Sequence, residues 1–123
     1  DVTHDTDSPM YNKIKQGDIS AGNGPVVSYA PAVHNTLLND LIGVAEKEGI
    51  PFQRLAASRF TGTDTDAFAY SMDGIASALI SLPLKYMHTT VEMVHQEDVE
   101  NLIRLFYHFL LQLDPNKKYN YFN

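Results

Sequence analysis

The feature that most constrains the fold is one short, mostly apolar run, Ser77-Ala-Leu-Ile-Ser-Leu-Pro83. Side chains alternate between the two faces of a strand, so apolar residues at consecutive positions require both faces to be covered. Strands of this kind are typical of sheets that carry helices on their faces. The run therefore predicts a buried strand over residues 77–83 in an α/β sheet.

Segments of strand and helix character alternate along the rest of the chain. Two further strands are predicted at residues 26–30 and 51–57, where β-branched or apolar residues follow a proline. Helices are predicted at residues 35–48, 64–73 and 97–113, where apolar positions recur every three or four residues. This order predicts an α/β domain of three layers, with a mostly parallel or mixed sheet flanked by helices.

Loops and helix ends follow from local composition. Residues 1–24 are rich in Asp, Gly, Ser and Asn and predict mostly loop, and residues 116–123 predict a ragged tail. Asn35 is the predicted N-cap of the first helix, with His34 at its entrance, and Gly49 is predicted to end it in a left-handed conformation. The last helix is predicted to pack through one apolar side, which consists of Val99, Leu102, Ile103, Phe106, Phe109, Leu110 and Leu113.

The composition excludes several classes of function. The 123 residues include 15 Asp and Glu against 9 Lys and Arg, for a net charge of −6. Nucleic-acid binding needs a concentrated basic face, which the scattered Lys and Arg do not supply. Because Cys is absent, disulfides and thiolate sites are excluded, and any metal must be bound by His and carboxylates. No apolar run approaches the ~20 residues of a membrane span.

The stretch Thr61-Gly-Thr-Asp-Thr-Asp-Ala-Phe68 predicts a glycine-containing turn that leads into a helix. Gly62 supplies the turn conformation, Asp64 is the predicted helix cap, and Asp66 lies where the helix dipole favours negative charge. A second interpretation is that the turn binds substrate, because free N–H groups at a helix start can bind a carbonyl or carboxylate. The residues alone fit both interpretations.

Candidate metal ligands lie after the strong strand and at the start of the chain. His88, in Lys85-Tyr-Met-His-Thr89, follows the predicted strand at the end where α/β sheets place ligands. Imidazole is a common zinc ligand, although a loop His bonded to a nearby carbonyl explains the same position. The stretch Asp1-Val-Thr-His-Asp-Thr-Asp7 gathers one His and several Asp, which fit a small metal site or Asx turns; we favour the turns.

These three stretches together resemble the C-terminal part of the tetrahedral-aminopeptidase and glutamyl-aminopeptidase family of two-metal peptidases. Residues 81–92 are similar to the family's strand–Pro–basic–Tyr–x–His–Ser/Thr stretch, which implies that His88 binds one of the two metals. Lys85 and Thr90 are mild departures, since the family often has Arg and Pro at these places. The resemblance covers residues 1 to about 113.

The same resemblance assigns roles to two other places in the chain. Asp1-Val-Thr3 is similar to a strand end whose Asp binds the second metal, which implies this role for Asp1. The turn of Gly62, Thr63 and Asp64 is similar to a turn beside the family's active site, which implies that it contacts substrate.

The resemblance also implies what this chain lacks. The family supplies a His-x-Asp motif, a bridging Asp and a Glu-Glu pair upstream, and neither the motif nor the pair occurs here. Residues 1–123 are therefore interpreted as the C-terminal portion of a catalytic metallopeptidase domain, without the upstream half, the inserted oligomerisation domain or a catalytic residue. For the parent protein the family implies removal of N-terminal residues from peptides, two divalent metals (zinc, with cobalt or manganese as alternatives), a homo-oligomer and a cytoplasmic location.

Two other functions fit the same residues. The chain could be a non-catalytic interaction module with an aminopeptidase-like fold, or part of a related co-catalytic zinc deacylase. A Glu-Glu pair and a His-x-Asp motif upstream of Asp1 would favour the peptidase. If Asp1 ends a central strand, the isolated chain exposes an unpaired sheet edge and is predicted to be inactive and to dimerise or aggregate.

Overall fold

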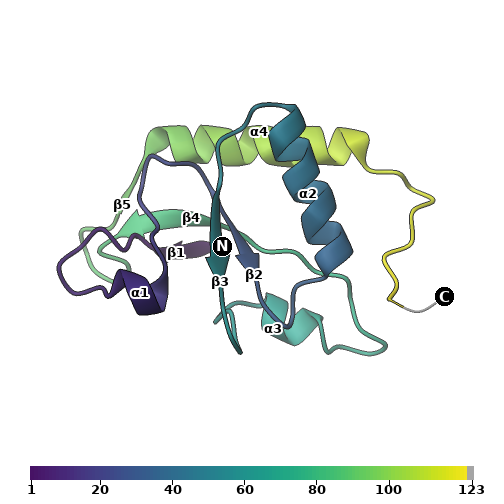
Figure 1. Cartoon of the computed structure of the whole chain (residues 1–123), viewed down its shortest axis with the longest axis horizontal. Helices are drawn as coiled ribbons and strands as arrows, with labels where there is room; N and C mark the ends of the chain where they lie inside the picture. The colour runs from purple at the N-terminus through teal and green to yellow at the C-terminus, as the bar shows by residue number, and fades with distance from the viewer. Residues whose placement is uncertain (122–123) are drawn as a thin grey trace.

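The computed structural model describes residues 1–121 and consists of a mixed sheet with helices packed against it (Figure 1). The strands are β1 (Val2–His4), β2 (Val26–Tyr29), β3 (Gln53–Ala56), β4 (Ile80–Lys85) and β5 (Met93–Val94). The helices are α1 (Lys13–Gln16), α2 (Asn35–Lys47), α3 (Thr65–Phe68) and α4 (Gln96–Gln112). The predicted fold class, an α/β sheet flanked by helices, is confirmed. Within residues 1–121, no helix has both the length and the apolar character needed to cross a membrane.

Strand directions in the sheet decide which loops share an end. The order is β1-β4-β2-β3, and β5 pairs with the last residues of β4. β1 is parallel to β4 and β2 is parallel to β3, whereas β2 and β4 are antiparallel. The carboxyl ends of β1 and β4 therefore lie at one end of the sheet, and those of β2 and β3 lie at the other.

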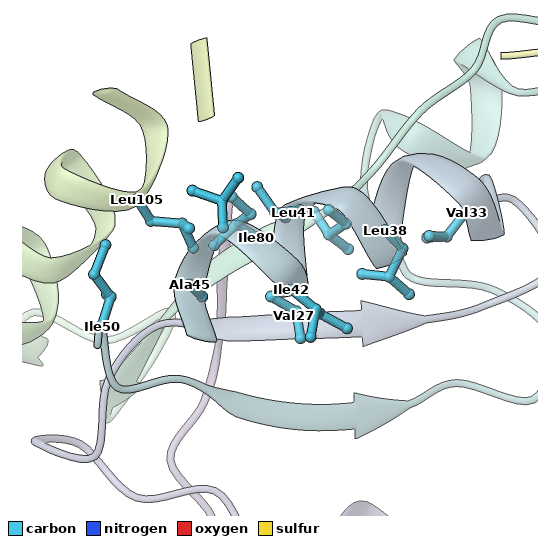
Figure 2. Packing of buried hydrophobic residues seen from close by; sticks show 11 residues of the cluster. Val27, Val33, Leu38, Leu41, Ile42, Ala45, Ile50, Ile80 and Leu105 are labelled. Carbon is cyan, nitrogen blue, oxygen red and sulfur yellow. The ribbon is translucent and has the colours of Figure 1, made fainter. Parts of the chain in front are cut away.

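The hydrophobic core lies between the sheet and the two long helices. Figure 2 shows side chains from β2, β4, α2 and α4 meeting in this cluster. Its buried members are Val27, Val33, Leu38, Leu41, Ile42, Val44, Ala45, Ile50, Leu79, Ile80 and Leu105. Full burial of a Val, Leu or Ile side chain contributes about 1.5–3 kcal/mol. This cluster fixes the positions of β2 and β4 and, with them, the loops at both ends of the sheet.

The face through which α4 packs differs from the prediction. Leu105 is fully buried, with Leu102 and Phe109 packed partly against the core. The predicted face is instead largely exposed at Ile103, Phe106, Leu110 and Leu113. Helix α4 carries apolar residues on more than one side, so periodicity alone does not identify the side that meets the sheet. Contact with α2 and β4 selects it.

Several element boundaries also differ from the prediction. β4 starts three residues later than expected and continues through Pro83, which lies opposite Thr3 of β1. The segment before it still runs beside the end of β2, where the His34 N–H donates to the Ser77 carbonyl at 2.8 Å. The N-cap of α2 is His34, whose ring accepts the Leu37 N–H, so the prediction of Asn35 as the cap was wrong.

The loops contain more structure than predicted. The loop predicted over residues 1–24 contains β1 and α1, and α3 has a single turn where a helix was predicted over residues 64–73. Met72 adopts a positive φ of 52°, and hydrogen bonds typical of tight turns connect residues 68–74. Gly49, with φ 62°, ends α2 as predicted. Sequence propensity predicted the helix after Asp64, but local turns replace most of it.

The tail over residues 116–121 is held against α2, so the prediction of a ragged tail was wrong for these residues. Asp40 on α2 accepts hydrogen bonds from Lys117 and from the Tyr119 hydroxyl, the latter at 2.9 Å. Burial raises the pKa of Tyr119, and the hydrogen bond to Asp40 raises it further. The Tyr121 hydroxyl accepts the Asn35 N–H at 3.0 Å. Residues 122–123 lie outside the described part of the chain.

Candidate metal and substrate site

Asp1 is the first of the two candidate metal ligands, and backbone hydrogen bonds hold it at the start of β1. Its terminal ammonium donates to the Ile80 carbonyl at 3.0 Å, and its carbonyl accepts the Leu82 N–H at 3.0 Å. One carboxylate oxygen accepts the Val2 N–H at 2.7 Å. Asp1 is thus fixed level with the first residues of β4, and its side chain is exposed.

His88 lies in the loop between β4 and β5, three residues after β4 ends. Tyr86 and His88 have positive φ values of 58° and 64°, a backbone conformation that costs a non-glycine residue about 1–3 kcal/mol. Side chains stabilise the loop: Glu92 accepts the His88 N–H at 2.6 Å, and the Thr89 hydroxyl donates to the Tyr86 carbonyl at 2.6 Å. Strain of this kind clusters at functional sites, and the His88 imidazole is exposed.

The structure places the two candidates at different ends of β4. Asp1 lies beside Ser81, and His88 follows Lys85, so their backbones are separated by at least four strand residues, about 13 Å along the strand. Within residues 1–121, no group of three or more His, Asp or Glu residues is close enough to hold a metal ion. A catalytic zinc generally takes three protein ligands.

The Gly62 turn is fixed by Asp66 and not by Asp64. The Asp66 carboxylate accepts the N–H groups of Thr61 and Gly62 at 2.9 Å each, and the Thr61 bond is the main reason that the pKa of Asp66 is lowered. The Thr63 N–H is bonded to the Thr61 hydroxyl at 3.2 Å. The N–H groups of Thr61, Gly62 and Thr63 therefore have internal partners, while the Asp64 side chain makes no capping hydrogen bond. Asp64 occupies the N-cap position as predicted, but the predicted side-chain cap is not formed.

Directly after β1, Asp5 and Asp7 form a turn, as favoured from the sequence. Asp5 is buried, and its carboxylate accepts the Asp7 N–H at 2.6 Å in an Asx turn and the Ala21 N–H at 2.8 Å. His4 bonds through Nδ1 to the Tyr11 hydroxyl at 2.7 Å.

Comparison with known proteins identifies the family of this chain. Residues 1–105 match the model of the M42 glutamyl aminopeptidase family. The chain belongs to this family.

Individual relatives agree with the family match. The chain is 37% identical over 94 residues to a lysyl aminopeptidase of Pyrococcus furiosus, an alignment that covers 76% of this chain and 27% of that protein. The structure is similar to a TET aminopeptidase from a marine-sediment thaumarchaeon, with a TM-score of 0.81, 26% identity, and coverage of 94% of this chain and 32% of the other. It is also similar to the Pyrococcus horikoshii TET1 peptidase, with a TM-score of 0.67, 31% identity, and coverage of 80% and 29%. The chain spans about a third of the length of these M42 relatives.

The buried Asp98, which lies within the part of the chain that matches the M42 family, connects α4 to the loop before β2, and this role was not predicted from the sequence. Asp98 in the first turn of α4 has no exposed surface, and its carboxylate accepts the N–H groups of Gly22 and Gly24 at 2.7 and 2.8 Å. The position of Asp98 in the first turn of a helix does not by itself predict that its side chain reaches a distant loop. The glycine-rich stretch over residues 22–24 was the available signal. This bond fixes α4 against the loop that precedes β2.

Proposed function

We propose that this chain is part of a dinuclear-metal aminopeptidase that hydrolyses N-terminal residues from peptides. The observation that carries the proposal is the match to the M42 family over residues 1–105, a span that contains both candidate ligands and the Gly62 turn. The match favours a peptidase over the zinc deacylase and over the non-catalytic module.

In this proposal, Asp1 and His88 bind different ions of the metal pair. The ions of such pairs lie about 3.5–4 Å apart, so ligands of different ions need not reach one common point. The strained backbone at His88 supports a role for that loop beyond connecting two strands. The remaining ligands and the general base would come from outside residues 1–123. When bound, two divalent ions (zinc, with cobalt or manganese as alternatives) would polarise the scissile carbonyl and activate a water molecule.

The turn of Gly62, Thr63 and Asp64 is proposed to face the substrate. The N–H groups of Gly62 and Thr63 are bonded internally, and the Asp64 side chain makes no capping hydrogen bond, so we assign the substrate contact to the Asp64 carboxylate. The family is described as glutamyl and the Pyrococcus furiosus relative as lysyl, so the proposal covers N-terminal residues in general.

Assembly and location are part of the same proposal. The Pyrococcus horikoshii relative is described as assembling into a tetrahedron or a large octahedral shell, which supports a homo-oligomer for the whole protein. We also propose a cytoplasmic location.

The test is metal content and peptidase activity of the whole protein with Asp1→Ala or His88→Ala. Each change is expected to lower bound metal by about one ion and to lower kcat/KM a hundredfold or more, since even residues that only support a metal ligand contribute 10–100-fold. His108→Ala is the matched control, because His108 makes only a 3.7 Å contact with Glu48. Unchanged metal content in both variants would remove the site. Hydrolysis of N-acylated amino acids in place of peptides would favour the deacylase.

A further inference from the structure

A pocket of about 480 Å³ lies away from His88, between the end of β2, the segment after α3 and the C-terminal tail. Residues that line it include His34, Tyr70, Asp73, Ile75, Tyr119 and Tyr121. Its volume falls within the range of small-molecule sites, about 300–1,000 Å³. The two tail tyrosines lie beyond residue 105, where the match to the M42 family ends.

His34 contributes a buried hydrogen-bond donor that has no partner. The residue is only 7% exposed, and its Nδ1 accepts the Leu37 N–H at 3.4 Å. In a neutral imidazole with Nδ1 as acceptor, the proton is on Nε2. Nε2 is buried and has no hydrogen-bond partner in the described part of the chain. Because buried polar groups are nearly always bonded, this donor calls for an acceptor oxygen, which a water or a ligand can supply.

Tyr121 places a second donor beside the first. Its ring stacks on His34, with ring centroids 4.2 Å apart and an angle of 25° between the planes. Its hydroxyl oxygen accepts the Asn35 N–H, and this bond leaves the hydroxyl hydrogen available to donate. Both donors lie at the N-terminus of α2, a helix of 13 residues with no acidic residue in its first turn. The helix dipole therefore adds a positive potential that favours a carboxylate.

Asp73 and the walls of the pocket define the rest of the ligand. Among the described residues that line this pocket, Asp73 is the one with a carboxylate side chain, and it would attract a cationic group. Val33 and Ile75 supply apolar contacts. We propose that the pocket binds a free α-amino acid as its zwitterion, with the carboxylate on His34 Nε2 and the Tyr121 hydroxyl and the ammonium towards Asp73.

The ligand chemistry is tested by titrating the full chain, observed by NMR, with L-phenylalanine and two analogues. L-phenylalaninamide lacks the carboxylate and N-acetyl-L-phenylalanine lacks the ammonium. L-phenylalanine is expected to shift the His34 and Tyr121 signals saturably, and the amide to bind about tenfold more weakly, because a hydrogen bond to a charged group contributes about this factor. Equal binding of L-phenylalanine and its amide, or no binding of either, would overturn the proposal.

Three substitutions test the residues. His34→Ser keeps an oxygen that can cap α2 but removes Nε2, and Tyr121→Phe keeps the ring but removes the hydroxyl; each is expected to weaken L-phenylalanine binding about tenfold. Asp73→Asn is expected to abolish the preference for L-phenylalanine over its N-acetyl derivative, and it keeps the proposal testable if His34→Ser does not fold. His108→Ser, outside the pocket, is the control. Wild-type affinity in the first two variants, or an unchanged preference in Asp73→Asn, would rule the site out.

Discussion

At the residue scale, Gly24 shows how closely the loop before β2 approaches β3. A Cβ atom at this position would lie 2.4 Å from the Pro51 carbonyl oxygen, and its φ of 97° is one that residues with a side chain rarely adopt. Its N–H donates to the buried Asp98 carboxylate. A glycine is therefore required here by backbone packing and by conformation, and its N–H adds a long-range hydrogen bond.

Gly24→Ala is expected to lower the free energy of unfolding by about 2 kcal/mol or more, through backbone strain and the clash with Pro51. Gly43→Ala is the matched control. Gly43 lies in α2 with nothing within 4 Å of an added Cβ, so alanine should raise the free energy of unfolding by about 0.5–1 kcal/mol. The urea midpoints of the two variants measure both effects. A Gly24→Ala protein as stable as the wild type would contradict the described loop.

Also at the residue scale, the Asp66 carboxylate makes the stability of the Gly62 turn depend on pH. Its pKa is lowered from the ordinary 3.8, first of all by the hydrogen bond from the Thr61 N–H. A lowered folded-state pKa means that the carboxylate stabilises the turn above its ordinary pKa, and that this contribution is lost as the pH falls through the lowered value. The amide signals of Thr61 and Gly62, followed by NMR, should titrate below pH 3.8, and Asp66→Asn should abolish that transition. A midpoint at or above 3.8 would contradict the hydrogen bonds.

At the element scale, α4 shows that an amphipathic pattern locates a helix better than it orients one. The helix was predicted over residues 97–113 and is observed at Gln96–Gln112. Its orientation was predicted only in part: Leu102 and Phe109 pack against the core as predicted, whereas Ile103 and Leu110 lie outside it. A similar limit applies to α3, where a cap was assigned to Asp64 although Asp66 makes the bonds. Both errors arise because these contacts depend on other parts of the fold and not on the residue pattern of the helix itself.

The stability of variants with leucines of α4 replaced by alanine shows which side of the helix packs against the core. Leu105→Ala is expected to lower the free energy of unfolding by about 2–5 kcal/mol, because it leaves a cavity in the core. Leu110→Ala, on the same helix but 62% exposed, should change it by about 0.5 kcal/mol or less. Thermal or urea unfolding of the two variants gives the comparison. Equal losses would mean that α4 is rotated relative to the described structure.

At the scale of the whole molecule, the surface of this chain exposes many large apolar side chains. On α4 alone, Ile103, Phe106, Tyr107, Leu110 and Leu111 are all exposed. In the described part of the chain, β1 and β3 each pair with one neighbour only, so both leave an edge of the sheet open. Exposed apolar patches and open strand edges both favour association.

The isolated chain is therefore expected to dimerise or aggregate at micromolar concentration, measured by light scattering after size exclusion. Replacing Phe106 and Leu110 by Glu should shift the chain towards monomer, because charges on the exposed side of α4 oppose its burial against another surface. Arg104→Glu on the same helix, which changes charge without removing an apolar side chain, is the control. A wild-type chain that is a monodisperse monomer with sharp thermal unfolding would contradict the prediction.

The sequence by itself determined the alternation of strands and helices, the mixed α/β sheet and membership of an aminopeptidase family, because apolar periodicity and short motifs are properties of contiguous residues. Only the tertiary structure decided which side of α4 is buried, which Asp fixes the Gly62 turn, and that the tail returns to α2. It also showed that Asp1 and His88 lie at different ends of β4. These features depend on residues far apart in the chain, and their energies come from packing and long-range hydrogen bonds that no local pattern contains.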